Sequence, residues 1–163
     1  MPGELAVRKQ VRVNTHPAAA FAVFTQGHGR WWPLATHHMG PSTPETAVLE
    51  PFVGGRWFER AVDGTVYEWG RVLVWDPPHR LILAWQVNYD CKQIANPCTE
   101  VELLFIEEGP ESTRVQLTHR HLDRYGEMGE KMHSIFNAEN GWILVLQCFA
   151  RATAAWPASA SRQ

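Results

Sequence analysis

The sequence has few of the features that mark exported, membrane-inserted or disulfide-stabilised proteins. Its three cysteines, Cys91, Cys98 and Cys148, form no CxxC pair, so we interpret them as free thiols and expect a reducing, cytoplasmic location. No apolar run reaches the roughly 20 residues that a membrane-spanning helix needs, and residues 1–10 lack the apolar segment of an export signal. Neither export nor membrane insertion is predicted.

An excess of charge of one sign is also missing, as are the common motifs of phosphate and nucleophile chemistry. Fifteen basic and seventeen acidic residues give a formal net charge of −2 without a long run of either sign, so no nucleic-acid partner is expected. There is no phosphate loop or dinucleotide fingerprint, and no serine has the glycine context of a nucleophile elbow. No cofactor is therefore expected.

Large aromatic side chains, by contrast, are abundant. The 163 residues include eight tryptophans and seven phenylalanines, and 45% of the chain is hydrophobic. A chain of this length and composition forms a packed core, so residues 1–163 are predicted to be one domain, with a core at about 5–153 and a flexible tail at 157–163. So many rings either pack tightly or surround concave apolar space.

Hydrophobic periodicity predicts a strand, two short helices, six more strands and a long helix. A period of two predicts strands at residues 5–14, 47–50, 56–61, 66–75, 80–88, 99–107 and 113–122. Proline and aromatic spacing predicts short helices at 17–25 and 30–32, and a period of 3.6 predicts one helix over 127–153. Residues 34–46 are predicted to form a loop long enough to gate a cavity.

The short connections between the last six strands predict an antiparallel meander. With the first strand and the helices added, the predicted fold is α+β, a seven-stranded curved antiparallel sheet wrapped around a long C-terminal helix, with two short helices after the first strand.

Several short motifs point to a known family by their order and spacing. They are Trp31-Trp32, Gly54-Gly55-Arg56-Trp57, Asp63-Gly64, Gly70-Arg71-Val72, Pro77-Pro78-His79-Arg80-Leu81, Thr113-Arg114-Val115 and Gly141-Trp142. In these residues the chain resembles the SRPBCC superfamily with its START-like helix-grip fold, and within it the branch similar to the activator of heat-shock-protein-90 ATPase. The resemblance implies an apolar cavity between sheet and helix; relatives bind lipids, sterols, hormones or polyketides, some are cyclases, and the namesake docks on a chaperone.

Strand parity and the helical period select the candidate ligand-binding residues, except Trp32, which is expected to meet Trp142 where the short helices pack on the long one. The inner face of the sheet and the apolar stripe of the long helix meet across the expected cavity. The candidates are Trp32, Trp57, Trp85, Phe105, Leu117, His119, Met132, Phe136, Trp142 and Leu146. Each is interpreted as a core residue, a cavity wall, or both.

Two histidines on the last strand share the parity of apolar Leu117, so both His119 and His121 are expected to face inward. A zinc site would need a further ligand such as His133 or Glu139. The favoured alternative is one inward histidine hydrogen-bonded to a neighbour and one at the rim, so no metal is predicted.

His119 and Glu68 are the candidates for general acid–base chemistry. Glu59 is expected to form a cross-strand ion pair with Arg71. Gly141, placed in mid-helix, is expected to allow the Trp31-Trp32 pair to approach the helix backbone.

These features support three hypotheses for function. The first is binding of a small hydrophobic ligand in the cavity. The alternative is an enzyme that acts on a hydrophobic substrate in the cavity, either similar to a polyketide cyclase/dehydratase or a hydrolase. The third is an interaction module that contacts a chaperone or forms a homodimer.

Overall fold

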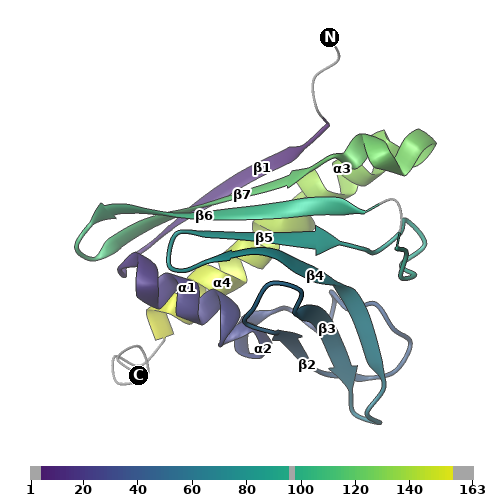
Figure 1. Ribbon diagram of the computed structural model, residues 1–163, viewed down its shortest axis with the longest axis horizontal. Coiled ribbons are helices and arrows are strands. Elements are labelled where there is room, and N and C mark those ends of the chain that lie inside the picture. The colour runs from purple at the N-terminus through teal and green to yellow at the C-terminus, as the bar shows by residue number, and fades with distance from the viewer. Residues whose placement is uncertain (1–4, 96–97, 156–163) are drawn as a thin grey trace.

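Seven antiparallel strands form one strongly curved sheet in the computed structural model, which describes residues 5–95 and 98–155 (Figure 1). The sheet order is β1-β7-β6-β5-β4-β3-β2, so the predicted meander from β2 to β7 is confirmed and β1 pairs with β7. The strands are β1 Val7–Val13, β2 Pro44–Leu49, β3 Arg56–Ala61, β4 Val66–Asp76, β5 Arg80–Trp85, β6 Thr99–Gly109 and β7 Ser112–Arg120. The predicted tail at 157–163 lies outside the described residues.

The helices pack on the inner face of the sheet, where α1 (Pro17–Thr25), α2 (His28–Trp31) and the C-terminal segment meet (Figure 1). The His16 imidazole accepts a hydrogen bond from the Ala19 backbone N–H and caps α1, and Pro17 occupies its first turn. The C-terminal segment consists of the 3-10 helix η1 (Leu122–Met128), α3 (Gly129–Asn137), the π-helical turn η2 (Glu139–Ile143) and α4 (Leu144–Ala155). None of the helices in the described ranges is long and apolar enough to cross a membrane.

The prediction of one uninterrupted helix over 127–153 is wrong. Ala138 has extended backbone angles, and Gly141 has φ −88° and ψ −132°, so α3 and α4 are separate helices joined by the π turn. The expected reason for Gly141 is wrong as well. A Cβ there would lie 2.4 Å from the Phe136 carbonyl oxygen, so the crowding comes from the preceding turn and not from the Trp31-Trp32 pair.

Strand β4 carries two irregularities that a strict period of two does not describe. Trp57 pairs with Gly70 while Phe58 pairs with Glu68, and Val72 pairs with Leu83 while Val74 pairs with Ile82. Each register shift inserts one residue into β4 and reverses its side-chain parity. As a result, the inward-facing residues of β4 do not alternate strictly. They are Tyr67 and Trp69, then Val72 beyond the first shift, and Trp75 beyond the second.

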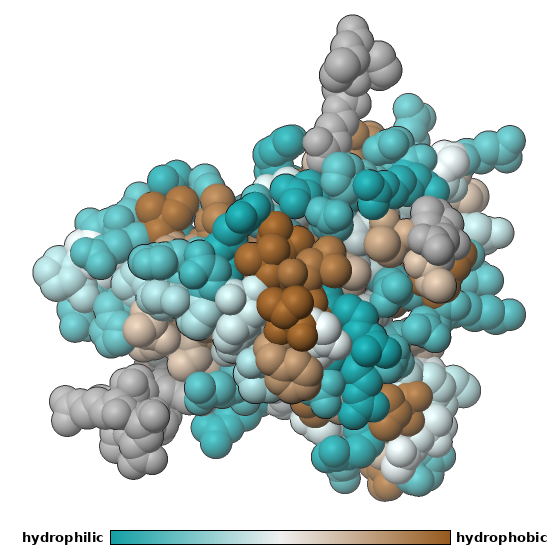
Figure 2. All heavy atoms as spheres, in the orientation of Figure 1, coloured by the Kyte–Doolittle hydropathy of each residue, from teal (hydrophilic) through white to brown (hydrophobic). Residues whose placement is uncertain are grey.

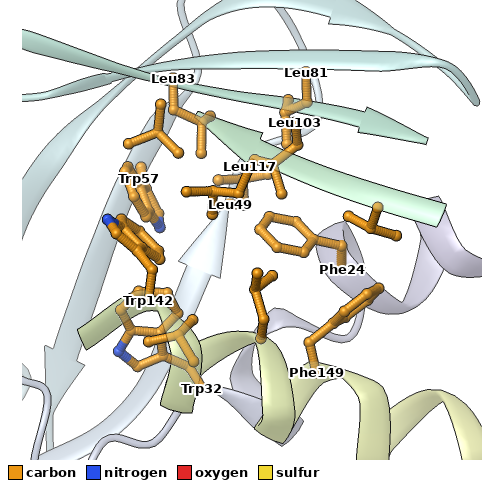
Figure 3. Close-up of a cluster of buried hydrophobic side chains, with 14 of the residues drawn as sticks. Phe24, Trp32, Leu49, Trp57, Leu81, Leu83, Leu103, Leu117, Trp142 and Phe149 are labelled. Atoms are coloured by element: carbon orange, nitrogen blue, oxygen red, sulfur yellow. The ribbon is translucent and has the colours of Figure 1, made fainter. Parts of the chain in front are cut away.

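The interior is filled with large side chains at the end nearer α1 and the C-terminal part of α4. Phe24 contacts Phe105 and Phe149 with ring centroids 6.1 and 5.4 Å apart, and Figure 3 shows Phe24 and Phe149 beneath the leucines of the central strands. Leu81, Leu83, Leu103 and Leu117 are at most 1% exposed. This end of the molecule is close-packed core.

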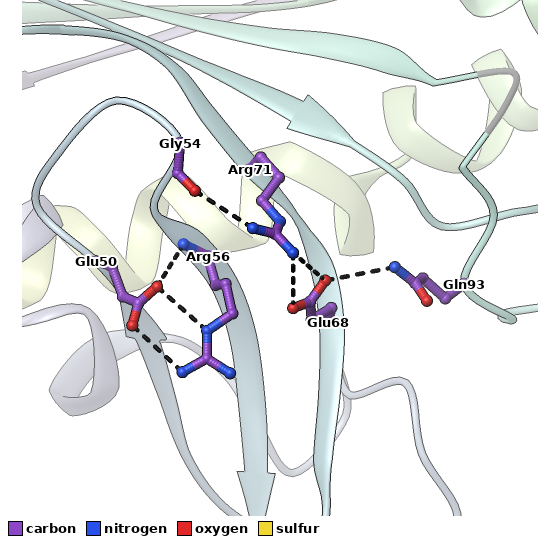
Figure 4. Close-up of polar contacts among 6 residues, drawn as sticks. All are labelled: Glu50, Gly54, Arg56, Glu68, Arg71 and Gln93. Carbon is purple, nitrogen blue, oxygen red and sulfur yellow. Dashed lines mark hydrogen bonds and ion pairs between the residues drawn. The ribbon is translucent and has the colours of Figure 1, made fainter.

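The outer face of the sheet shows a strip of hydrophobic residues flanked by hydrophilic ones (Figure 2), and ion pairs connect several of its charged side chains. Two of these pairs are drawn in Figure 4: Glu50 with Arg56, and Glu68 with Arg71. The four side chains are 22–47% exposed, so solvent weakens both ion pairs and they contribute little to stability.

Candidate functional site

A pocket of about 450 Å³ lies at the break between α3 and α4. Its walls come from residues 32–39 after α2, from β4 and β5, from the segment after β5, and from the helix break. The lining residues are Trp32, Thr36, His37, His38, Met39, Trp69, Trp85, Val87, Cys91, Ile135, Phe136, Asn140, Gly141, Trp142, Leu144 and Val145. This lining set contains no aspartate, glutamate, lysine or arginine, so the pocket suits a mostly apolar molecule.

Tryptophan rings from four different elements form one continuous wall of the pocket. The ring centroids of Trp32 and Trp69 are 4.9 Å apart, and those of Trp85 and Trp142 are 5.8 Å apart. Trp32 also meets Trp142 at 6.1 Å and nearly perpendicular. Since the rings brace one another, the wall is formed before any ligand binds.

Behind this wall, His119 fixes the orientation of Trp142. The Trp142 indole N–H donates to His119 Nδ1 at 3.0 Å, so in the neutral ring Nε2 carries the hydrogen and donates to the Thr99 hydroxyl at 2.7 Å. The imidazole is fully buried, and this desolvation lowers the pKa of His119 to about 3. His119 is therefore a neutral support for the wall, with both ring nitrogens occupied.

A second buried histidine, His28, supports Trp57 in the same manner. The Trp57 indole N–H donates to His28 Nε2 at 3.0 Å, while Nδ1 donates to the Phe24 carbonyl at 2.9 Å. Burial lowers the pKa of His28 to about 4, against the opposing effect of the Phe24 carbonyl. The sequence gives no signal for this role, because Gly27-His28-Gly29 resembles a simple helix stop.

Glu59 is fully buried on β3, and the predicted ion pair with Arg71 is wrong. Its carboxylate accepts hydrogen bonds from the Trp69 indole N–H at 2.8 Å and from the backbone N–H groups of Met39 and Gly40. Arg71 lies on the outer face and pairs with Glu68 (Figure 4). Glu59 thus joins the pocket wall to residues 39–40 of the loop.

The loop from residue 33 to residue 43, named the entrance loop from here on, is also fastened to the helix break. The Trp32 indole N–H donates to the His37 carbonyl at 2.9 Å, and His37 Nε2 donates to the Asn140 carbonyl at 2.7 Å. The loop predicted at 34–46 to gate a cavity contributes residues 36–39 to the pocket lining, but it ends earlier than predicted because β2 begins at Pro44.

The expected inward pair of histidines on the last strand is wrong, whereas the favoured alternative is confirmed. Strand β7 ends at Arg120, and His121 adopts φ 66° with its Nε2 3.8 Å from Glu100 at the rim. His133 instead contacts the Ala6 carbonyl at 3.0 Å. No group of three or more His, Cys, Asp or Glu residues suited to a metal ion occurs among the residues that the structure describes.

The structure divides the predicted ligand-binding residues into three sets. Trp32, Trp85, Phe136 and Trp142 line the pocket. Trp57 and His119 lie directly behind it, in contact with Trp85 at 5.3 and 5.5 Å between ring centroids. Phe105, Leu117, Met132 and Leu146 are buried in the core outside the lining set.

Glu68, the other acid–base candidate, lies outside the pocket lining in its ion pair with Arg71. Sequence reasoning missed the lining contributed by Trp69, Met39 and the helix break. The bulges reverse the side-chain parity of β4, Met39 lies in a loop without a hydrophobic period, and apolar residues continue through the helix break.

A curved sheet gripping C-terminal helices around an aromatic pocket defines a helix-grip protein. The family model for activator of Hsp90 ATPase homolog 1-like proteins matches residues 14–153, and the chain belongs to this family. The resemblance and the fold class predicted from the sequence are confirmed. A comparison with curated proteins finds no match.

Solved structures of known proteins share the fold. An anthrahydroquino-gamma-pyrone synthase, Txn09, is 36% identical over 93% of this chain and 99% of its own, with a TM-score of 0.63. The self-sacrificing resistance protein CalC from Micromonospora echinospora is 28% identical, with 94% and 96% coverage and a TM-score of 0.65. An HSP90 activator from Plasmodium falciparum is 18% identical over 71% of this chain and 72% of its own, with a TM-score of 0.50. At this identity the similarity supports the fold and nothing further. The family and these structures fit a fold that binds hydrophobic ligands.

Proposed function

We propose that this protein binds a small, flat, hydrophobic molecule in the pocket at the helix break. The observation that carries the proposal is the tryptophan wall around a space of about 450 Å³ without charged lining residues. Ligand pockets typically measure about 300–1,000 Å³ and combine apolar walls with a few polar groups. Here the polar lining residues include Thr36, His37, His38 and Asn140.

Aromatic polyketides are the ligand class that the comparisons favour. The synthase at 36% identity is named for an anthrahydroquinone fused to a γ-pyrone, a planar system of several rings. Indole faces and edges interact well with such rings, whereas a flexible acyl chain would gain less from a rigid aromatic wall.

The test is a titration with alizarin, a dihydroxyanthraquinone, followed by quenching of tryptophan fluorescence. Leu144 lines the pocket, so Leu144→Trp should fill it and weaken alizarin binding at least tenfold. Leu73 is 41% exposed on β4 and outside the lining set, so Leu73→Trp is the matched control and should bind like the wild type. Equal affinity of the wild type and Leu144→Trp would contradict the proposal.

The second candidate function is ring closure on an aromatic polyketide, which the identity with the synthase favours. A suitable test substrate is an anthraquinone with a β-diketone side chain ortho to a hydroxyl. Attack of the hydroxyl oxygen on the distal carbonyl carbon, followed by loss of one water, gives the γ-pyrone. Chromatography with mass detection should show faster closure with the wild type than with Leu144→Trp; equal rates would count against an enzyme.

Among the acid–base candidates, Glu68→Gln should leave such turnover unchanged, since Glu68 lies outside the pocket lining. A role in contacting a chaperone and a homodimer remain predictions.

A further inference from the structure

The histidines in and behind the pocket differ in which ring nitrogens are occupied. His119 uses both nitrogens, for Trp142 and Thr99. His37 also uses both, for the Asn140 carbonyl and the Thr36 hydroxyl, each at 2.7 Å. His38 lines the pocket at its exposed rim and uses only Nδ1; within the described parts of the chain its Nε2 has no hydrogen-bond partner.

The tautomer of His38 follows from that single contact. Nδ1 lies 2.9 Å from the Gly40 carbonyl oxygen, which only accepts hydrogen bonds, so Nδ1 must donate. In the neutral ring the hydrogen is therefore on Nδ1 and the lone pair is on Nε2. A histidine oriented through Nδ1 in this way presents Nε2 as a base.

The backbone that follows His38 is held by Glu59 and Tyr67. The buried Glu59 carboxylate accepts the N–H groups of Met39 and Gly40. Gly40 packs directly on the Tyr67 ring, since a Cβ at residue 40 would lie 2.3 Å from it, and the Tyr67 hydroxyl lies 3.0 Å from Ser42 Oγ. The acceptor carbonyl and the imidazole are thus pre-positioned without a ligand.

We propose that His38 Nε2 is the proton acceptor of the pocket and that the ligand carries an acidic phenolic or enolic hydroxyl. On binding, the ligand O–H bond breaks and an Nε2–H bond forms, leaving an aryl oxide beside an imidazolium. No other reactant is needed, and the exposed ring can pass the proton to water. This inference rests on the proposed function and narrows its ligand class.

The surroundings make this proton transfer observable. The other titratable lining residues are His37 and Cys91, and Glu59 lies behind Met39. Because the lining set holds no lysine or arginine, protonated His38 is the counter-ion adjacent to the aryl oxide. An adjacent positive charge lowers the pKa of an acid by about one unit or more, whereas an apolar pocket alone raises it.

Alizarin tests the inference because its visible absorption changes when its hydroxyl ionises. Absorption spectra of fully bound alizarin are recorded across a pH series. In the wild type the bound dye should ionise at lower pH than the free dye, with an acid ionisation constant about ten times larger. His38→Gln keeps a hydrogen-bond acceptor but no base, so the bound dye should ionise at higher pH than the free dye. His79, an exposed residue outside the lining set, gives the matched control His79→Gln, which should behave like the wild type.

The two proposals fail in different ways. No fluorescence quenching by alizarin in the wild type would overturn the proposed function together with the inference. Quenching with the same ionisation midpoint in the wild type and His38→Gln would leave ligand binding intact and overturn only the role of His38. Loss of binding in His38→Gln is checked by its unfolding curve, and a folded variant that no longer binds supports direct contact between His38 and the dye.

Discussion

At the residue scale, buried neutral histidines support the pocket wall by accepting indole N–H groups. Each lies in the place of an apolar core residue, yet it satisfies a tryptophan donor that would otherwise be buried without a partner. The arrangement depends on both His28 and His119 staying neutral, which makes it sensitive to acid.

Acid should therefore weaken the fold in a defined range. The folded-state pKa values of about 4 for His28 and about 3 for His119 lie below the ordinary 6.5, so only the unfolded chain takes up these protons at mildly acidic pH. The neutral histidines contribute fully to the free energy of unfolding above about pH 6.5. This contribution decreases as pH falls toward 4, by roughly 3 kcal/mol for His28 alone. Denaturant unfolding at several pH values measures this.

The matched variants separate these histidines from other acid effects. His119→Gln should lower stability at neutral pH. It should also make the loss of stability between pH 6.5 and 4 smaller, because the unfolded chain then takes up one proton fewer in this range. His79→Gln should retain the wild-type slope. A wild-type free energy of unfolding that stays constant over this range would contradict the assignment of neutral, buried imidazoles.

Glu59 gives a second test at this scale. In Glu59→Gln an amide N–H₂ replaces one acceptor and meets the N–H donors of Trp69, Met39 or Gly40, so the variant should lose about 1–3 kcal/mol of stability. Glu68→Gln breaks an outer-face ion pair and should cost less than about 1 kcal/mol. Equal losses in urea unfolding would contradict the junction role of Glu59.

At the element scale, strands were predictable and their irregularities were not. The strand at Arg56–Ala61 was predicted to the residue, since alternation and flanking glycines are local signals. The bulges of β4 and the break before α4 are set by pairing and packing with distant segments, and apolar residues continue through both. The two bulges reverse the side-chain parity of β4 twice, so alternation alone does not assign Glu68 to one face of the sheet.

Gly141 tests the helix break. Gly141→Ala places a Cβ 2.4 and 2.7 Å from the carbonyl oxygens of Phe136 and Ile135, so the π turn must shift, at a cost of about 1–3 kcal/mol and with weaker alizarin binding. Gly109→Ala meets only Ser112 Cβ at 3.8 Å and should change stability little. Thermal unfolding of both variants measures the difference; equal stability would contradict the crowding at residue 141.

At the scale of the whole molecule, the interior has a filled end and a hollow end. Strand parity and helix packing placed large apolar residues inside but did not separate Phe105 and Leu117 at the filled end from Trp32 and Trp142 at the hollow end. That separation depends on where the helix breaks and on how the entrance loop returns to the sheet, and neither is encoded locally.

Ligand binding should stabilise the whole chain by mass action. At a free alizarin concentration about 100 times its Kd, the folded state gains about 2.7 kcal/mol, which corresponds to a rise of roughly 5–10 °C in Tm for a domain of this size. Leu73→Trp should show the same rise and Leu144→Trp almost none at that dye concentration. A Tm that does not respond to the dye in the wild type would contradict binding to the folded pocket.

The break between α3 and α4 also bears on how such a chain can diversify. The hollow end is bounded by the π turn and the entrance loop, whereas the filled end holds the close-packed core. Residues 138–140 are exposed, whereas Trp142 belongs to the buried core, so changes of sequence at 138–140 would alter the space for a ligand with the least effect on the core. New ligand preferences can arise here with little loss of foldability, which makes the segment a natural target for redesign.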